Sequence, residues 1–384
     1  MKVIKFNARA IRDTREDSTI EISLKTNFGE FVSSAPNGKS RGKSEAKPWK
    51  ESLKEDVEFV NNYFIEGIIF KKFEDLETLE DIFSSNVGAN TMIAIEYVFL
   101  KALAKEQGKE VWELINSRAS KLPYPVGNAI GGGKHSEGKK PDFQEFHFIP
   151  ITNFSEAVEI NKRAWENCKE ILKNVDANFK EKTNDENAWQ TSLGNEQVLE
   201  VMKNVRDNMK DEFGVKIHLG IDVAGSSFYN RGKYNYQNPK NNLIKKDQIK
   251  LINKIVKDIF YLEDPLEEND FIGFSKLQSN GLIVGDDLTT TNLERLKIAH
   301  LKKSINAIII KPNQIGSLIE VEKIVDYCKK NKIKMIFSHR SGETSDSILA
   351  DLCFGFQGEF IKTGIKGKGR DEKLNRLIEI ERRL

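Results

Sequence analysis

A chain of 384 residues can bury a large core, either as two domains or as one large barrel with an appendage. Its net charge of +2 arises from 60 basic and 58 acidic side chains, and this balance argues against a nucleic-acid-binding domain. The three widely spaced cysteines predict no disulfide framework or zinc site, and without a signal-peptide pattern or an apolar run near the roughly 20 residues of a membrane span, we expect a soluble, cytoplasmic protein.

The first third of the chain has the pattern of a small α+β unit. Strand patterns occupy residues 3–6, 18–24 and 29–33. A loop rich in small and polar residues follows at 35–44. Residues 91–105 have a helical pattern that is apolar on most of its surface, with Asn90 as its expected N-cap, so we expect this helix to be largely buried.

A domain boundary is predicted where two closely spaced prolines, Pro123 and Pro125, interrupt the chain. We therefore expect an α+β domain at residues 1–121 and a second domain at 122–384. The second domain begins with a strand pattern at 143–149. Helical patterns follow at residues 156–174, 195–212, 248–258 and 317–330.

From residue 217 onwards, apolar runs recur, and each is followed by a functional group. In chain order these groups are Asp222, Glu263, Asp286, Lys311, His339 and Lys362. They are spaced 23 to 41 residues apart, which is about the length of a strand, a loop, a helix and a return loop. Repeated βα units form an open sheet or a closed barrel, and six successive strand ends with polar groups favour a closed (β/α)8-type barrel with its active site at those ends.

Three of these strand ends carry carboxylates, Asp222, Glu263 and Asp286. Brought together, three anions repel one another unless a cation lies between them. Oxygen ligands of this charge suit a hard divalent ion, Mg²⁺ before Zn²⁺. Helix N-caps and loop acids would give the same residue types, but three at successive strand ends favour the metal site.

Two other strand ends carry lysines. Lys311 and Lys362 follow buried runs, where desolvation and neighbouring positive charge can lower the pKa of a lysine until it becomes a usable base. A side chain that simply reaches out to solvent is the alternative. Among earlier residues, Glu145 lies within a strand pattern, Glu186 lies in a polar loop, and His135 follows three glycines and could turn towards a ligand.

The segment 337–344 offers a candidate anion site. It lies between a strand pattern at 334–337 and a helical pattern at 345–352, so His339, Arg340 and Ser341 are expected where a strand ends and a helix begins. Arginine provides a forked donor, serine a hydroxyl and histidine a titratable ring. A capped polar turn is the alternative interpretation.

Taken together, these motifs resemble those of the enolases, nearly from end to end of the chain. The most specific are Leu-Glu-Asp-Pro at 262–265, Val-Gly-Asp-Asp-Leu-Thr at 284–289, Ile-Lys-Pro-Asn-Gln-Ile-Gly at 310–316, Ser-His-Arg-Ser-Gly-Glu-Thr at 338–344 and Ile-Lys-Thr-Gly at 361–364. The resemblance implies an N-terminal domain that caps a barrel with irregular first units. It also implies the interconversion of 2-phosphoglycerate and phosphoenolpyruvate, and a dimer or a multiple of dimers.

The resemblance also implies a role for each site residue. Two Mg²⁺ ions are expected, one held tightly by the three acids named above and one held by the substrate phosphate with the help of Ser40. Lys311 would take the C2 proton, and Glu186 would assist loss of the C3 hydroxyl. The remaining matches are Glu145 and Gln144 beside Glu186, Arg340 and Ser341 at the phosphate, Lys362 at the substrate carboxylate, and His135 and His339 as active-site histidines.

The chain departs from the family pattern in two loops. Residues 184–188 lack the usual glycines, and Lys39 adds a cation beside Ser40. Three hypotheses follow: an active enolase, a superfamily enzyme that acts on another acid, and a non-catalytic relative kept for binding. Because Lys311 and the three metal-binding acids are all retained, the first is favoured.

Overall fold

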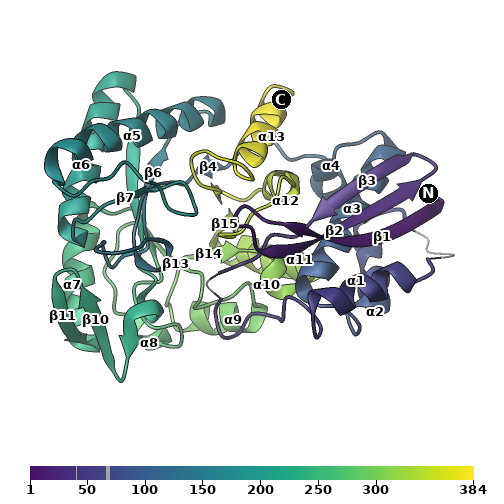
Figure 1. Ribbon diagram of the computed structural model, residues 1–384, viewed down its shortest axis with the longest axis horizontal. Helices are drawn as coiled ribbons and strands as arrows, with labels where there is room; N and C mark the ends of the chain where they lie inside the picture. Colours follow the sequence, from purple (N-terminus) through teal and green to yellow (C-terminus); the bar gives the residue numbers. More distant parts are fainter. Residues whose placement is uncertain (40, 66–69) are drawn as a thin grey trace.

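The N-terminal part of the computed structural model is a three-stranded antiparallel sheet packed on helices (Figure 1). The structure describes residues 1–39, 41–65 and 70–384. The elements here are β1 (Val3–Arg12), β2 (Ser18–Thr26), β3 (Gly29–Ser34), α1 (Leu53–Asn62), η1 (Phe73–Asp75), α2 (Leu76–Phe83), α3 (Ala89–Gln107) and α4 (Val111–Asn116). Ile20, Ile22 and Leu24 alternate along β2 and are buried, because one face of the sheet packs on α3. The predicted α+β unit is confirmed.

The start of α3 differs from the prediction. Gly88 is its N-cap, and Asn90 lies inside the helix. Asp56 of α1 provides the missing acceptor, because its Oδ2 accepts hydrogen bonds from Gly88 N at 2.9 Å and from Thr91 Oγ1 at 2.6 Å. A carboxylate from a neighbouring helix thus does the work expected of a local cap. Asn90 Oδ1 instead accepts from Asn313 Nδ2 at 2.9 Å.

The rest of the described chain is built on a mixed ten-stranded sheet with the order β4-β16-β15-β14-β13-β12-β8-β6-β5-β7. The strands are β4 (Tyr124–Pro125), β5 (Gly127–Gly131), β6 (Glu145–Pro150), β7 (Trp189–Gln190), β8 (Ile217–Asp222), β12 (Tyr261–Glu263), β13 (Leu282–Gly285), β14 (Ala307–Ile310), β15 (Lys334–Ser338) and β16 (Phe360–Lys362). All neighbours from β8 through β16 to β4 are parallel, whereas β6 runs antiparallel to both β5 and β8. A compact cluster of buried apolar residues, including Val126, Ile149 and Ile309, packs together on these strands.

Helices and a small outlying sheet connect these strands. The helices are α5 (Phe154–Val175), α6 (Asn195–Phe213), α7 (Lys245–Ile255), α8 (Phe271–Phe274), α9 (Leu293–Leu301), α10 (Pro312–Ile315), α11 (Leu318–Asn331), α12 (Ile348–Gly355) and α13 (Asp371–Glu381), with single turns η2 (Gly133–His135), η3 (Gly225–Phe228) and η4 (Val256–Asp258). The small sheet is β9 (Tyr229–Asn230), β10 (Lys233–Gln237) and β11 (Lys240–Ile244), at the opposite end of Figure 1 from β1 to β3. In the described residues, no helix combines the length and the apolar character that crossing a membrane requires.

The predicted helices at 156–174, 195–212, 248–258 and 317–330 are confirmed within a few residues at their ends. The helix expected from residue 345 is not: α12 begins at Ile348, and its N-cap Ser347 makes no side-chain capping bond. Asp346 Oδ1 accepts from Ile348 N at 3.0 Å and holds the preceding turn. The helix start is therefore several residues beyond Ser341, and the helix dipole argument for the 337–344 segment fails.

The recurring strands place the functional groups at one edge of the sheet, as predicted. Asp222, Glu263 and Lys362 are the last residues of their strands. Asp286, Lys311 and His339 follow their strands directly. Because the strands are parallel neighbours, all six groups lie at the same end.

Candidate active site

Glu145 lies at the same end of the sheet as these six groups, because β6 runs antiparallel to β8. Glu145 is the first residue of β6 and is paired in register with Asp222, the last residue of β8. An antiparallel strand begins where its neighbour ends, so Glu145 meets acids that come from strand ends. Gln144, just before it, donates from Nε2 to Asp222 Oδ2 at 3.0 Å. An unpaired carboxylate within a buried strand would be costly, and Glu145 has two partners, His147 and Lys362.

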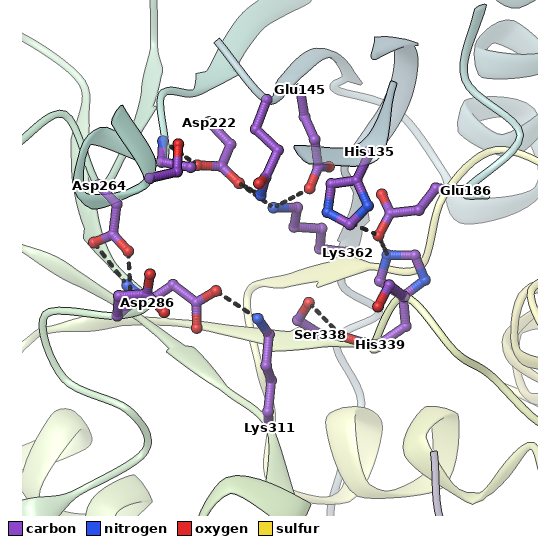
Figure 2. A pocket seen from close by; sticks show the side chains of 15 residues that line it. His135, Glu145, Glu186, Asp222, Asp264, Asp286, Lys311, Ser338, His339 and Lys362 are labelled. Atoms are coloured by element: carbon purple, nitrogen blue, oxygen red, sulfur yellow. Dashed lines mark hydrogen bonds and ion pairs between the residues drawn. The ribbon is translucent and has the colours of Figure 1, made fainter. Parts of the chain in front are cut away.

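Lys362 lies at the centre of a buried acidic group on one side of the pocket (Figure 2). Its Nζ is 2.8 Å from Glu263 Oε2, 3.2 Å from Glu145 Oε1 and 3.5 Å from Asp222 Oδ2. Burial works against the ammonium charge, but the surrounding acids raise the pKa of Lys362 well above its usual value.

The three acids around Lys362 differ in the direction of their pKa shifts. Burial raises the pKa of Asp222 to about 7, and burial with the charge of Asp222 raises the pKa of Glu263 well above its usual value. Burial also acts on Glu145, but Lys362 and the His147 hydrogen bond hold its pKa well below the usual value. One lysine is therefore too little positive charge for this cluster.

Lys311 and Asp286 face this group from the other side of the pocket (Figure 2). Lys311 Nζ donates to Asp286 Oδ2 at 2.5 Å. Burial alone would lower the pKa of Lys311, as the sequence suggested, but the paired carboxylate raises it. The same pair lowers the pKa of Asp286 against the effect of burial. Lys311 is thus a protonated ion-pair partner in this arrangement.

Glu186 extends from the loop after α5 towards both predicted histidines. Its Oε1 is 3.9 Å from Nε2 of His135 and 3.9 Å from Nε2 of His339, and its Oε2 accepts from Asn128 Nδ2 at 3.2 Å. Burial and the charge of Glu145 raise the pKa of Glu186. The raised pKa favours the protonated form of this carboxyl group.

The two histidines are in opposite charge states. Burial disfavours the imidazolium of His135, but Glu186 and Asp185 raise its pKa to about 9, and its Nδ1 is 3.0 Å from Asp185 Oδ1. Burial and the Arg370 charge lower the pKa of His339 well below its usual value. His135 can therefore act as a cation and His339 as a neutral ring.

The loop that carries Glu186 contains no glycine between residues 184 and 188. Asn187 has φ +63°, a conformation that asparagine tolerates better than other non-glycine residues. The Oδ1 atom of Asn184 accepts hydrogen bonds from Glu186 N and Ala188 N, both at 3.0 Å. Two asparagines thus replace the conformational freedom of the glycines.

Ser341 and Arg340 have different surroundings. Ser341 lines the pocket, and its Oγ accepts from Arg15 Nη1 at 3.0 Å and from Lys39 N at 2.9 Å. Arg340 lies behind it, with Nη2 3.0 Å from Glu45 Oε2. Ser40, predicted to help hold the second ion, lies outside the described residues.

Most of the predicted site residues line one cavity. Those that line it are His135, Gln144, Glu145, Glu186, Asp222, Asp286, Lys311, His339, Ser341 and Lys362. Of the predicted residues that the structure describes, Glu263 and Arg340 do not line it. Both are buried. Glu263 is paired with the lining residue Lys362, and Arg340 directly precedes the lining residue Ser341 in the chain.

The donor set fits a hard divalent cation in its chemistry. It consists of buried carboxylates with excess negative charge, and the cation would compensate that charge. The tightest groups in the described chain are two others, His135 with Glu145 and Glu186, and Asp264 with Asp286 and Asp287; the ligand atoms of each lie within 4.8 Å of one another. The ligand atoms of the predicted triad are not gathered as closely. Lys362 is paired with both Asp222 and Glu263, and Lys311 is paired with Asp286.

Several residues in or around the site were not singled out from the sequence. Asp264 accepts from the backbone N–H groups of Asp286 at 3.1 Å and Asp287 at 2.6 Å, and so fixes that turn. Its place directly after Glu263 at a strand end was an available signal. Arg370 donates to the carbonyl oxygens of Asp185 and Ser341, at 3.2 and 3.3 Å. For Arg370, Arg15 and Glu45, no local pattern marks a contact so distant along the chain.

Comparisons with known proteins identify relatives of the chain along nearly its whole length. Residues 119–384 match the family model described as the enolase C-terminal TIM barrel domain. The chain is 34% identical to the enolase of Methanosphaera stadtmanae over 396 aligned positions, which cover 98% of this chain and 96% of that protein. It is 35% identical to the enolases of Archaeoglobus fulgidus and Saccharolobus solfataricus, with 97% and 98% of this chain and 95% of each relative covered.

Proposed function

The chain belongs to the enolase family, and we infer from this premise that the pocket carries out the reversible dehydration of 2-phospho-D-glycerate to phosphoenolpyruvate and water. The enzyme is accordingly a phosphopyruvate hydratase, a carbon–oxygen lyase of glycolysis and gluconeogenesis. The observation that carries the proposed residue roles is the placement of Lys311 and Glu186 on opposite sides of one cavity (Figure 2).

We assign the two proton transfers to these two residues. Lys311 Nζ takes the proton from C2, the electron pair forms the C2–C3 double bond, and the C3 hydroxyl leaves as water with a proton from Glu186. The raised pKa of Glu186 supports the acid role. If Asp286 served as a metal ligand, its pairing with Lys311 would weaken, and burial would then lower the pKa of Lys311 towards that of a usable base.

A divalent metal cofactor follows from the family, and we propose two Mg²⁺ ions per site. Asp222, Glu263 and Asp286 would hold one, and Ser40 would help to hold the second. Bound there, Mg²⁺ would stabilise the charge that develops on the substrate carboxylate as C2 loses its proton.

The other residues of the pocket would bind and orient the substrate. Lys362 would turn from its acids to the substrate carboxylate. Arg340 and Ser341 would hold the phosphate, with Gln144 and His135 beside them. Glu145 and His339 complete the proposed catalytic group.

We also propose that the sheet closes into an eight-stranded barrel. Only Val126 separates β4, which pairs with β16, from β5, which pairs with β6. Treated as one strand, β4 and β5 join the two edges of the strand series. The proposed domains remain 1–121 and 122–384, and the family leads us to expect a cytoplasmic homodimer or a multiple of dimers.

The test is turnover of 2-phosphoglycerate by the purified chain with Mg²⁺, followed through the absorbance of phosphoenolpyruvate. We expect turnover that stops when a chelator is added and returns with Mg²⁺. A folded chain that binds Mg²⁺ without turnover would instead support a non-catalytic relative. Turnover of another carboxylic acid in place of 2-phosphoglycerate would support a different superfamily enzyme.

A further inference from the structure

A row of polar side chains lies one layer beneath the acids of the pocket. His147 is paired in register with Gly220, and Gly220 with Tyr261, across β6, β8 and β12. The acids Glu145, Asp222 and Glu263 are paired in the same way, two residues further towards the pocket. Because side chains alternate along a strand, each member of the lower row lies on the same face as the acid above it. We call His147, Gly220 and Tyr261 the supporting row.

The two ring residues of the supporting row each bind the acid directly above. His147 Nε2 is 3.0 Å from Glu145 Oε2, and Tyr261 Oη donates to Glu263 Oε2 at 2.8 Å. All four side chains are buried. Nε2 of His147 faces Glu145 Oε2, and among the described residues its buried Nδ1 has no hydrogen-bond partner.

Gly220 makes this arrangement possible. A Cβ atom at residue 220 would lie 3.0 Å from Tyr261 Cβ and 3.2 Å from His147 Cβ and Nδ1. Without it, the two rings meet edge to face, with centroids 5.4 Å apart and planes at 89°. Asp222, above the glycine, receives its hydrogen bonds from Gln144 Nε2 and Ala224 N instead of from below.

On β5, Asn128 extends the row by one residue and also donates a hydrogen bond to a carboxylate. Asn128 is paired in register with His147, is buried, and donates from Nδ2 to Glu186 Oε2 at 3.2 Å. Three side-chain donors in this layer, Asn128, His147 and Tyr261, thus each engage one buried carboxylate at or behind the pocket. A stability role alone does not account for a buried histidine with an unpaired Nδ1, because such a group costs free energy that an apolar side chain would not.

We propose that His147 and Tyr261 are positioning residues, which orient Glu145 for the dehydration and Glu263 for divalent-metal binding. Each donor fixes one carboxylate oxygen and so sets the plane of the group. The other oxygen of Glu145 contacts Lys362, and Lys362 contacts both oxygens of Glu263. The inference deepens the proposed function and rests on it for the role of Glu145.

The first test compares His147→Met with His147→Gln. Methionine fills the space without a donor, whereas glutamine can restore an N–H near the Nε2 position. We expect His147→Met to lower kcat by roughly 10- to 100-fold with little change in KM, and His147→Gln to recover most of kcat. Ile336→Val, an apolar change in the buried cluster that also contains Tyr261, is the control and should leave kcat unchanged. Full activity of His147→Met, or equal losses in both histidine variants, would overturn the role.

The second test does not depend on turnover. Tyr261→Phe removes one hydroxyl, and calorimetric titration with Mg²⁺ alone should show binding weakened by about 10-fold, with the melting temperature of the metal-free protein retained. Tyr236→Phe is the matched control, since it removes a buried hydroxyl that donates to Gln248 outside the supporting row. Unchanged Mg²⁺ affinity in Tyr261→Phe would overturn the proposal. If the wild-type chain binds Mg²⁺ but lacks turnover, the proposed function fails while this result still decides the role of Tyr261.

Discussion

Arg340 and Glu45 form a buried ion pair that ties the loop after β3 to the strand end at β15. Nη2 of Arg340 is 3.0 Å from Glu45 Oε2, and Arg340 Nη1 also donates to Asn313 Oδ1 at 3.1 Å. Gly38 of the same loop approaches so closely that a Cβ atom there would overlap the guanidinium. The guanidinium that we assign to the substrate phosphate is therefore held by an internal carboxylate.

Removing the charge of Glu45 should destabilise the protein. Glu45→Gln removes the negative charge that is paired with Arg340, and breaking a buried ion pair costs about 3 to 5 kcal/mol. Chemical denaturation followed by circular dichroism measures this loss. Glu30→Gln, which breaks the exposed pair with Lys25, is the control and should leave the midpoint unchanged. Equal midpoints for both variants would contradict the importance of the buried pair.

A backbone position in the first turn should be open to stabilisation. Glu16 has φ +64° and an exposed side chain, so its backbone lies in the left-handed region without a packing reason. Glu16→Gly should raise the free energy of unfolding by about 1 kcal/mol. Glu77→Gly, in the helical conformation of α2, should lower it by about 1 kcal/mol. A loss of stability in Glu16→Gly would show that the side chain contributes more than the backbone strain costs.

The His135 environment predicts a pH-dependent stability. Its pKa is raised to about 9 in the folded protein from 6.5, so the folded state binds the proton more tightly than the unfolded state. The resulting stabilisation, on the order of 1 to 3 kcal/mol, is fully present below pH 6.5 and is lost as the pH rises through about 9. Denaturation of the metal-free protein between pH 6 and 10, in steps of about one pH unit, measures this stabilisation.

The matched variant for this pH profile is His135→Gln, which cannot be protonated. Its stability should change less over the same range, and the difference between the two profiles isolates His135. Parallel profiles would mean that Asp185 and Glu186 do not hold a proton on this ring.

Metal binding should be sensitive to Asp264, although it was not among the predicted ligands. Asp264→Asn replaces one of the two oxygens that accept from Asp286 N and Asp287 N, and so loosens the turn that presents Asp286. We expect Mg²⁺ affinity to fall by about 10-fold in calorimetric titration, as for other residues that orient a ligand. Asp270→Asn, at the N-cap of α8, removes a comparable capping charge elsewhere and should leave the affinity unchanged.

The sequence predicted the strand ends well because parallel strands impose a regular spacing on the chain. Asp222, Glu263 and Lys362 could be placed from that rhythm alone. The position of Glu145 could not, since a strand pattern carries no direction and the reversal of β6 is a property of the whole sheet. The pairing of Arg340 with Glu45 likewise depends on how distant segments meet.

Local chemistry explains the other differences. The Asn90 cap was replaced by Asp56 from a neighbouring helix, and α12 begins at Ile348 because Asp346 holds the turn before it. At the 184–188 loop, Asn187 adopts the left-handed backbone for which glycine is usual. In each case, a contact or a residue type that the local pattern did not indicate took the place of the expected cap or glycine.

Exchange of the C2 proton with solvent tests the assignment of base and acid most directly. 2-Phosphoglycerate is incubated in deuterium oxide with Mg²⁺ and either Lys311→Ala or Glu186→Gln, and deuterium at C2 is followed by nuclear magnetic resonance. We predict no exchange with Lys311→Ala, and exchange without dehydration with Glu186→Gln, because only the lysine removes that proton. Exchange that persists in Lys311→Ala and disappears in Glu186→Gln would contradict the account.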